Sequence, residues 1–250
     1  KPAGSIAAEQ LHILGAVPSD AVGVMCFDSM SDALELFLDK TKAFSALLTE
    51  DGTDPTGLFL QKASESLSGG GLRQLRSADM AVSLHYNGSV SPLFIVEMPR
   101  HCNDSSDIVL SVKADAEACG LDARFHAGES ICTMLISPSE ALISSSVRHQ
   151  EEGVSILNNS GFTTCASRFG GSRVMYFSNS HAPQLLSEYF RRPVTANAPF
   201  VRRAADWTAF SISTAREYNL AMDGYASCIK GDGSFMHIFD ESGLGDCSFA

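Results

Sequence analysis

The chain has 250 residues, of which 44% are hydrophobic and 19% are charged, so it can bury a sizeable core and is not a disordered polymer. Its 29 acidic and 18 basic residues give a formal net charge of −11. A surface of that sign repels phosphate groups, which argues against a nucleic-acid partner and against electrostatic docking on anionic lipid. No stretch reaches the roughly 18 consecutive apolar residues that a membrane helix needs.

The first segment with a clear pattern is a strand followed by a helix. Residues 21–27 form an apolar run of strand length. Ser29 and Asp32 have the spacing of a capping box, in which the hydroxyl and the carboxylate each accept a backbone amide of the first turn. Apolar residues then recur at helical spacing as far as Leu48, which predicts one buried helix face.

A second helix and a hairpin follow. Asp54 is a good N-cap, Pro55 suits the first helical position, and the helix is expected to end at the glycines 69–71. Strands at 80–86 and 90–98 flank an Asn-Gly pair, which favours a tight hairpin turn.

The rest of the chain continues with alternating elements. A helix is expected over 104–119, a strand over 131–136, and then a helix with Ser137 as its cap and Gly153 just beyond its end. The remaining expected elements are helices at 162–169, 181–190 and 199–205 and strands at 173–177, 207–213, 218–229 and 234–239.

This order predicts an α+β fold, with antiparallel sheets and helices packed on one face. Without the helix at 55–68, the first part matches the split β-α-β order of ferredoxin-like folds. Two short motifs recur: Val24–Phe27 resembles Val174–Phe177, 150 residues later, and Arg76–Asp79 resembles Arg203–Asp206, 127 residues later. A duplication would make two ferredoxin-like units in tandem, and would place Met80 and Trp207 at equivalent sheet positions.

We therefore divide the chain into a linker at 1–16, a first α+β unit at 17–157 and a second, related unit at 158–250. The chain begins at Lys1 and its first methionine is Met25, so we expect that a signal or anchor has been removed upstream. We also expect the second unit to be truncated at its C-terminal end.

The cysteines and histidines show no pattern of a reactive site. The seven cysteines are odd in number and contain no C-x-x-C, which favours buried, reduced thiols (Cys26, Cys102, Cys119, Cys132, Cys165, Cys228, Cys247). The seven histidines lack zinc-ligand spacing. Those at 85, 126 and 237 lie in or beside strand-like runs, where we expect structural roles.

Four further segments resemble parts of functional sites, but each lacks a feature that such a site needs. The Ser227–Lys230 motif lies on a strand, where residues three apart face opposite sides. The loop Arg100–Asp104 holds His, Cys and Asp as sequence neighbours, which rarely face one another productively. Residues Asp51–Asp54 lack the later ligands of a calcium loop, and glycines 69–71 lack the Lys-Ser/Thr of a phosphate loop. We accordingly assign no catalytic, cofactor-binding or metal-ligating residue.

The run Val17–Asp28 resembles the opening of uncharacterised, envelope-anchored proteins of Gram-negative anaerobes, a group without an assigned activity. Leu135–Glu140, Gly153–Leu157 and Gly161-Phe162 are similar to a later stretch of the same group. The resemblance implies a location at the cell envelope and an N-terminal anchor or lipoprotein signal, and it implies no catalytic residue.

Three functions are compatible with these observations. The favoured one is a non-enzymatic, envelope-associated binding or scaffold module whose partner is a protein or an envelope component. The second is a hydrolase with a site assembled from distant residues, and the third is a cytosolic ligand-binding domain. An enzyme should show a deep pocket on which two or more titratable groups of perturbed pKa converge, whereas a scaffold should show a flat or grooved apolar patch.

Overall fold

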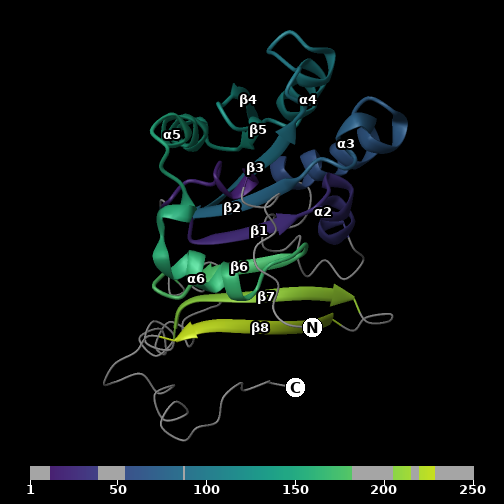
Figure 1. Ribbon diagram of the computed structural model, residues 1–250. Helices are drawn as coiled ribbons and strands as arrows, with labels where there is room; N and C mark the ends of the chain where they lie inside the picture. The colour runs from purple at the N-terminus through teal and green to yellow at the C-terminus, as the bar shows by residue number, and fades with distance from the viewer. Residues whose placement is uncertain (1–11, 39–53, 87, 182–204, 215–219, 229–250) are drawn as a thin grey trace, which may run out of the picture.

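The computed structural model describes residues 12–38, 54–86, 88–181, 205–214 and 220–228 (Figure 1). Their strands form one eight-stranded antiparallel sheet in the order β4-β5-β3-β2-β1-β6-β7-β8. The strands are β1 (Gly23–Phe27), β2 (Met80–Tyr86), β3 (Val90–Met98), β4 (Asp122–Ala127), β5 (Cys132–Ser137), β6 (Val174–Ser178), β7 (Ala205–Thr214) and β8 (Leu220–Cys228). The helices are α2 (Met30–Phe37), α3 (Pro55–Gly69), α4 (Asp107–Ala118), α5 (Glu140–Glu151) and α6 (Ser160–Arg168), with short 3-10 helices η2 (Arg73–Leu75) and η3 (Ile156–Asn158).

The α+β class is confirmed, but helices cover both faces of the sheet, not one. Figure 1 shows α2 and α3 on one side of the sheet and α5 and α6 on the other. Alternate residues of β1 supply the two cores: Met25 and Phe27 pack with α2, α3 and α4, whereas Val24 and Cys26 pack with α5, α6 and residues 13–17. Because every residue of β1 is apolar or glycine and buried, the strand suits a position covered on both sides.

The ferredoxin-like topology is not confirmed. That arrangement would place β3 next to β1, but β2 pairs with β1 and β3 pairs with β2. One split β-α-β unit does occur elsewhere. Strands β3 and β4, joined through α4, are both antiparallel to β5, which lies between them. Strand β4 was not predicted, because it is partly exposed and has no run or alternation of apolar residues.

Several expected caps are present. The Ser29 hydroxyl accepts the Asp32 N–H at 3.0 Å, and Asp54 Oδ1 accepts the Gly57 N–H at 2.8 Å. The cap of α5 is Ser139 and not Ser137, because Ser137 belongs to β5 and donates its hydroxyl to the Pro92 carbonyl at 2.8 Å.

Part of the prediction concerns residues outside the described ones, including the helix at 181–190, the strand at 234–239 and Arg203 of the second motif. In the part of the chain that is described, no helix is long and apolar enough to cross a membrane. The strands of both expected units belong to the same sheet, because β1 pairs with β6.

Candidate functional site

An open groove lies between α2 and α3, on the outer side of the helices that cover one face of the sheet. Its volume is about 470 Å³, within the ~300–1,000 Å³ range of small-ligand sites. Two buried leucines, Leu34 and Leu67, form its apolar base, and the half-exposed Leu38 lies at its rim. The lining residues are Ser31, Leu34, Glu35, Leu38, Ser64, Leu67, Ser68 and Arg76. We call this surface the α2–α3 groove.

Helical periodicity explains which side chains line the groove. On α2, Ser31, Glu35 and Leu38 are separated by one turn each and therefore share one side of the helix. On α3, Ser64 and Ser68 are likewise one turn apart. Each helix therefore offers polar side chains beside the apolar face that packs into the core.

Arg76 enters the groove from a different element, the turn between η2 and β2. Two backbone amides of α2 hold this turn in place: Met30 N donates to the Ala78 carbonyl at 2.8 Å and Ser31 N donates to the Arg76 carbonyl at 3.2 Å. The Arg76 side chain is exposed, and no described carboxylate lies within 4.0 Å of its guanidinium. The groove thus contains a cation that has no ionic partner in the described part of the chain.

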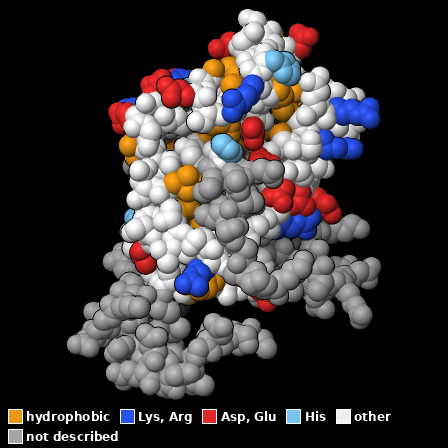
Figure 2. Space-filling model, viewed as in Figure 1, with side chains coloured by type: hydrophobic (Ala, Val, Ile, Leu, Met, Phe, Trp, Pro, Cys, Tyr) orange, Lys and Arg blue, Asp and Glu red, His pale blue; other side chains and the backbone are white. Residues whose placement is uncertain are grey.

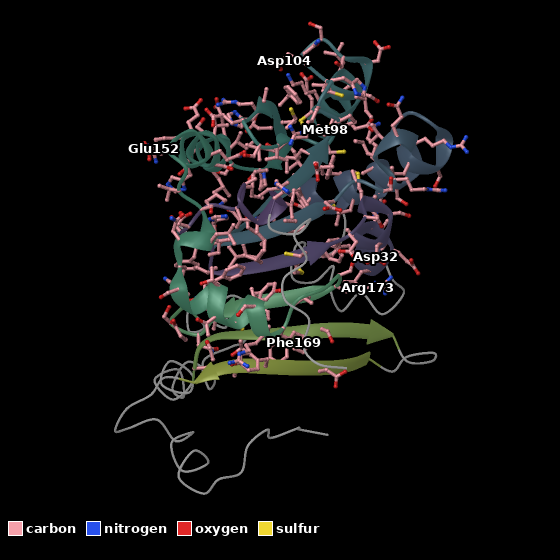
Figure 3. All side chains as sticks on the ribbon, viewed as in Figure 1. Asp32, Met98, Asp104, Glu152, Phe169 and Arg173 are labelled. Carbon is pink, nitrogen blue, oxygen red and sulfur yellow. The ribbon has the colours of Figure 1, made fainter. Side chains whose placement is uncertain are left out.

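The second arginine near the groove, Arg173, is fully engaged. Its Nε donates to Asp32 Oδ1 at 2.8 Å, its Nη2 contacts the same oxygen, and Glu35 Oε2 lies 3.6 Å from Nη2. The hydrogen bond to Asp32 is the main cause that raises the pKa of Arg173 above its usual value. Figure 3 shows Asp32 on α2 next to Arg173, which directly precedes β6. In Figure 2, acidic side chains gather over α2 with a basic side chain beside them.

The Asp32–Arg173 cluster fastens α2 to β6 across 141 positions of sequence. Ser172 Oγ donates to Asp32 Oδ2 at 3.2 Å and accepts the Asp28 N–H at 3.1 Å. Arg173 also donates its backbone N–H to the Cys26 carbonyl at 2.9 Å, with a φ of 57°. The Asp32 carboxylate therefore does not close the capping box expected from the sequence, but holds a distant arginine instead.

A Ser-His-Asp arrangement lies on the opposite face of the sheet. His85 Nε2 is 2.9 Å from Ser83 Oγ, and His85 Nδ1 is 3.3 Å from Asp20 Oδ1. The interaction with His85 is the main cause that holds the pKa of Asp20 below its usual value of 3.8. Ser83 has 0% exposure and His85 only 5%, so no substrate can reach this hydroxyl in the described conformation. His85 lies in β2, as its strand-like surroundings in the sequence predict, but no local pattern indicates its contacts with Ser83 and Asp20.

The loop at residues 100–104 does not form a reactive cluster. Arg100 Nη2 donates to the Ser130 carbonyl at 2.7 Å, and Asp104 Oδ1 accepts the Lys113 ammonium at 2.7 Å. Cys102 is buried, and burial raises the pKa of its thiol. The residues that are neighbours in sequence are therefore engaged by separate partners.

The segments at 51–54, 69–71 and 227–230 have structural roles where the structure describes them. Asp54 caps α3, and Gly70 ends it with a φ of 107°. Ser227 Oγ accepts the Trp207 N–H and donates to the Trp207 carbonyl, both at 3.0 Å, which joins β8 to β7. Lys230 and residues 51–53 lie outside the described residues.

Five cysteines are free thiols: Cys26, Cys102, Cys119, Cys132 and Cys165. Burial raises the pKa of Cys26 and of Cys165 to about 12, and it also raises the pKa of Cys102 and Cys119. A thiol with a raised pKa is a poor nucleophile at neutral pH because little of it is thiolate. Within the described ranges, no three His, Cys, Asp or Glu side chains are grouped so that they could hold a metal ion.

Sequence reasoning missed the two arginines that shape the candidate site. Arg76 belongs to the recurring motif Arg76–Asp79, so a signal existed, but the recurrence indicates a duplication and not a binding site. No local pattern marks Arg173, because its partner Asp32 lies in another unit of the chain. Only the pairing of β1 with β6 brings the two together.

No protein-family model matches the chain, and neither a curated protein nor a solved structure shows significant similarity to it. The α2–α3 groove and its charges are therefore the basis on which a function can be argued.

Proposed function

We propose that the protein is a non-enzymatic binding module that works at the cell envelope and holds its ligand in the α2–α3 groove. The observation that carries this proposal is a partly apolar, open groove that contains Arg76, a cation to which the described residues offer no carboxylate. A groove of this kind, with an apolar base and a few polar groups, is typical of sites that bind a ligand.

The reactive groups of the described residues support binding over catalysis. An acyl-transfer enzyme needs a nucleophile that its substrate can reach and a base beside it. Ser83 has such a base in His85, but both are buried, and the groove lies on the other face of the sheet. The serines that line the groove, Ser31, Ser64 and Ser68, have no histidine among their neighbours in the lining.

The envelope location is supported by the resemblance of Val17–Asp28 to the envelope-anchored proteins described above. Fractionation of cells that express the full-length gene, followed by detection with an antibody to residues 17–157, tests it. We expect the protein in the envelope fraction. Recovery in the cytosolic fraction would favour the third function, a cytosolic ligand-binding domain.

The binding function is tested by NMR with isotope-labelled protein and a pool of soluble peptides of random sequence. Backbone amide shifts should change at the α2–α3 groove in the wild type. Ser64→Trp, which places a large ring inside the groove, should abolish these changes. Leu58→Trp is the matched control, because Leu58 lies on the same helix, is 44% exposed and does not line the groove. Equal shifts in wild type and Ser64→Trp would contradict the proposal.

The hydrolase alternative is favoured by one observation, the contact between Ser83 and His85, and it has its own test. A fluorophosphonate probe that labels activated serines should leave Ser83 of the native protein unmodified, as mass spectrometry of tryptic peptides would show. Labelling at Ser83 that disappears in His85→Ala would establish a hydrolase and refute the binding-only function.

A further inference from the structure

We infer that the α2–α3 groove binds the carboxyl terminus of a partner polypeptide whose last residue has an aliphatic side chain. This inference rests on the proposed function and adds the chemistry of its ligand.

The charges of the groove favour a ligand with a single carboxylate. Arg76 is the one cation among the lining residues, and the described residues offer it no carboxylate. A guanidinium forms two parallel hydrogen bonds with a carboxylate, a geometry that an ammonium group does not provide. The remaining acidic group of the lining, Glu35, lies beside Arg173. Among the described residues, Arg76 is therefore a cation of the groove without a carboxylate partner.

The same charges disfavour more highly charged anions. A nucleotide or a phosphorylated peptide brings two or more negative charges, and Arg76 alone would have to compensate them. The net charge of −11 also repels highly charged anions, and it does so over a long range.

The base of the groove fits an aliphatic side chain next to the carboxylate. Leu34 and Leu67 are 3% and 5% exposed, and together with the rim residue Leu38 they offer an apolar surface beside Arg76. Ser31, Ser64 and Ser68 add hydroxyl groups that can donate to a carboxylate or accept from a peptide N–H. The last residue of a peptide presents this combination, because its carboxylate and its side chain are attached to the same Cα atom.

Fluorescence anisotropy with two peptides tests the inference. Both are fluorescein-labelled hexapeptides that end in leucine, one with a free carboxylate and the other with a C-terminal amide. We expect the free acid to bind about tenfold or more tightly than the amide, because only the acid pairs with Arg76. A third peptide, with a free carboxylate but a terminal glycine, should bind more weakly than the leucine peptide because it leaves the apolar base uncovered.

Two arginine variants locate the contact. Arg76→Gln should reduce the affinity for the free acid to that for the amide and leave the amide unaffected. Arg73→Gln is the matched control, because Arg73 is also exposed on the same turn but does not line the groove, and it should bind like the wild type. Both arginines are exposed, so both variants are expected to fold, which near-UV circular dichroism checks.

The possible results separate failure of the ligand assignment from failure of the proposed function. If acid and amide bind equally, or if Arg73→Gln weakens binding as much as Arg76→Gln, the carboxyl-terminal assignment is wrong. If none of the three peptides binds while the random pool still shifts groove resonances, the assignment is wrong and the binding function stands. If neither the peptides nor the pool affects the groove, the proposed function fails as well.

Discussion

Met25 of β1 lies directly opposite Met175 of β6 in the sheet. The two methionines are 150 positions apart, which is also the offset at which Val24–Phe27 recurs as Val174–Phe177. The two flanking pairs are arranged symmetrically about them, with Val24 opposite Tyr176 and Cys26 opposite Val174. Strand β1 is followed outward by β2 and β3, and β6 is followed outward by β7 and β8. The order β3-β2-β1-β6-β7-β8 is therefore symmetric about the β1–β6 pair. The two matched strands thus meet at a local two-fold axis.

The expected equivalence of Met80 and Trp207 is wrong by one residue. Met80 pairs with Phe27, but the residue that pairs with the corresponding Phe177 is Thr208, and Trp207 pairs with Ser178. A shift by one position moves a side chain to the other face of a sheet. Met80 accordingly packs with α2 and α3, and Trp207 packs with α6.

Trp207 should behave as a core residue. It is 2% exposed and its ring meets Phe162 edge-on at 5.2 Å between centroids. Trp207→Ala should lower the free energy of unfolding by about 3–5 kcal/mol, as truncation of buried aromatics does. Urea denaturation measures this change, with Leu58→Ala as the exposed control. A loss under about 1 kcal/mol would contradict the packing described here.

The Asp32–Arg173 contact should contribute more to the free energy of unfolding than the neighbouring Glu35–Arg173 contact. Asp32 and Arg173 are each about a quarter exposed, whereas Glu35 is 78% exposed. Arg173→Ala should cost about 1–3 kcal/mol, because it removes the charged donor of a largely buried carboxylate and leaves only the Ser172 hydroxyl to donate to it. Glu35→Gln should change stability by less than about 0.5 kcal/mol.

A double-mutant cycle with Asp32→Asn and Arg173→Ala checks this prediction. We expect the two losses to be strongly non-additive. Arg173→Gly provides a further comparison, because glycine adopts the φ of 57° without strain and should be less destabilising than alanine by up to about 1 kcal/mol. Additive losses would show that the two side chains do not interact.

Gly161 lies so close to β7 that an added side chain would displace its neighbours. A methyl group built at this position would collide with the exposed Asp206 carboxylate and lie 3.1 Å from Cδ1 of the buried Trp207. Gly161→Ala should therefore destabilise the protein, even though alanine is normally the better helix former. Adding Asp206→Ala should restore part of the loss, as thermal unfolding of the single and double variants would show. Greater stability of Gly161→Ala alone would contradict the close approach of β7 to α6.

The contribution of the Asp20–His85 contact should depend on pH. The pKa of Asp20 is held below its usual 3.8 in the folded protein, so the carboxylate stabilises the fold above that value. The contribution is lost as the pH falls through the lowered folded pKa. The stability difference between wild type and Asp20→Asn should thus be present near pH 6 and shrink at about pH 3 and below. A difference that does not change over this range would contradict the contact.

The elements that the sequence predicts well have local signals. Pro55 after Asp54 marks the start of α3, and the Asn-Gly pair marks the β2–β3 hairpin. The contacts that shape the candidate site are not local. Arg173 reaches Asp32 only because β6 pairs with β1, and Arg76 enters the groove only because the amides of α2 bind the turn before β2. Periodicity shows that a strand has two buried faces, but it does not show which helices cover each face.

The nitrogen resonances of the arginine side chains test the central claim most directly, namely that Arg76 in the α2–α3 groove binds the ligand's carboxylate. The Nε–H signal of Arg76 is assigned by its loss in Arg76→Gln, and that of Arg73 by its loss in Arg73→Gln. On titration with the leucine-terminated free-acid peptide, the Arg76 signal should shift in a saturable manner while the Arg73 signal stays in place. If the peptide saturates the protein and the Arg76 signal does not move, the account of this groove is wrong.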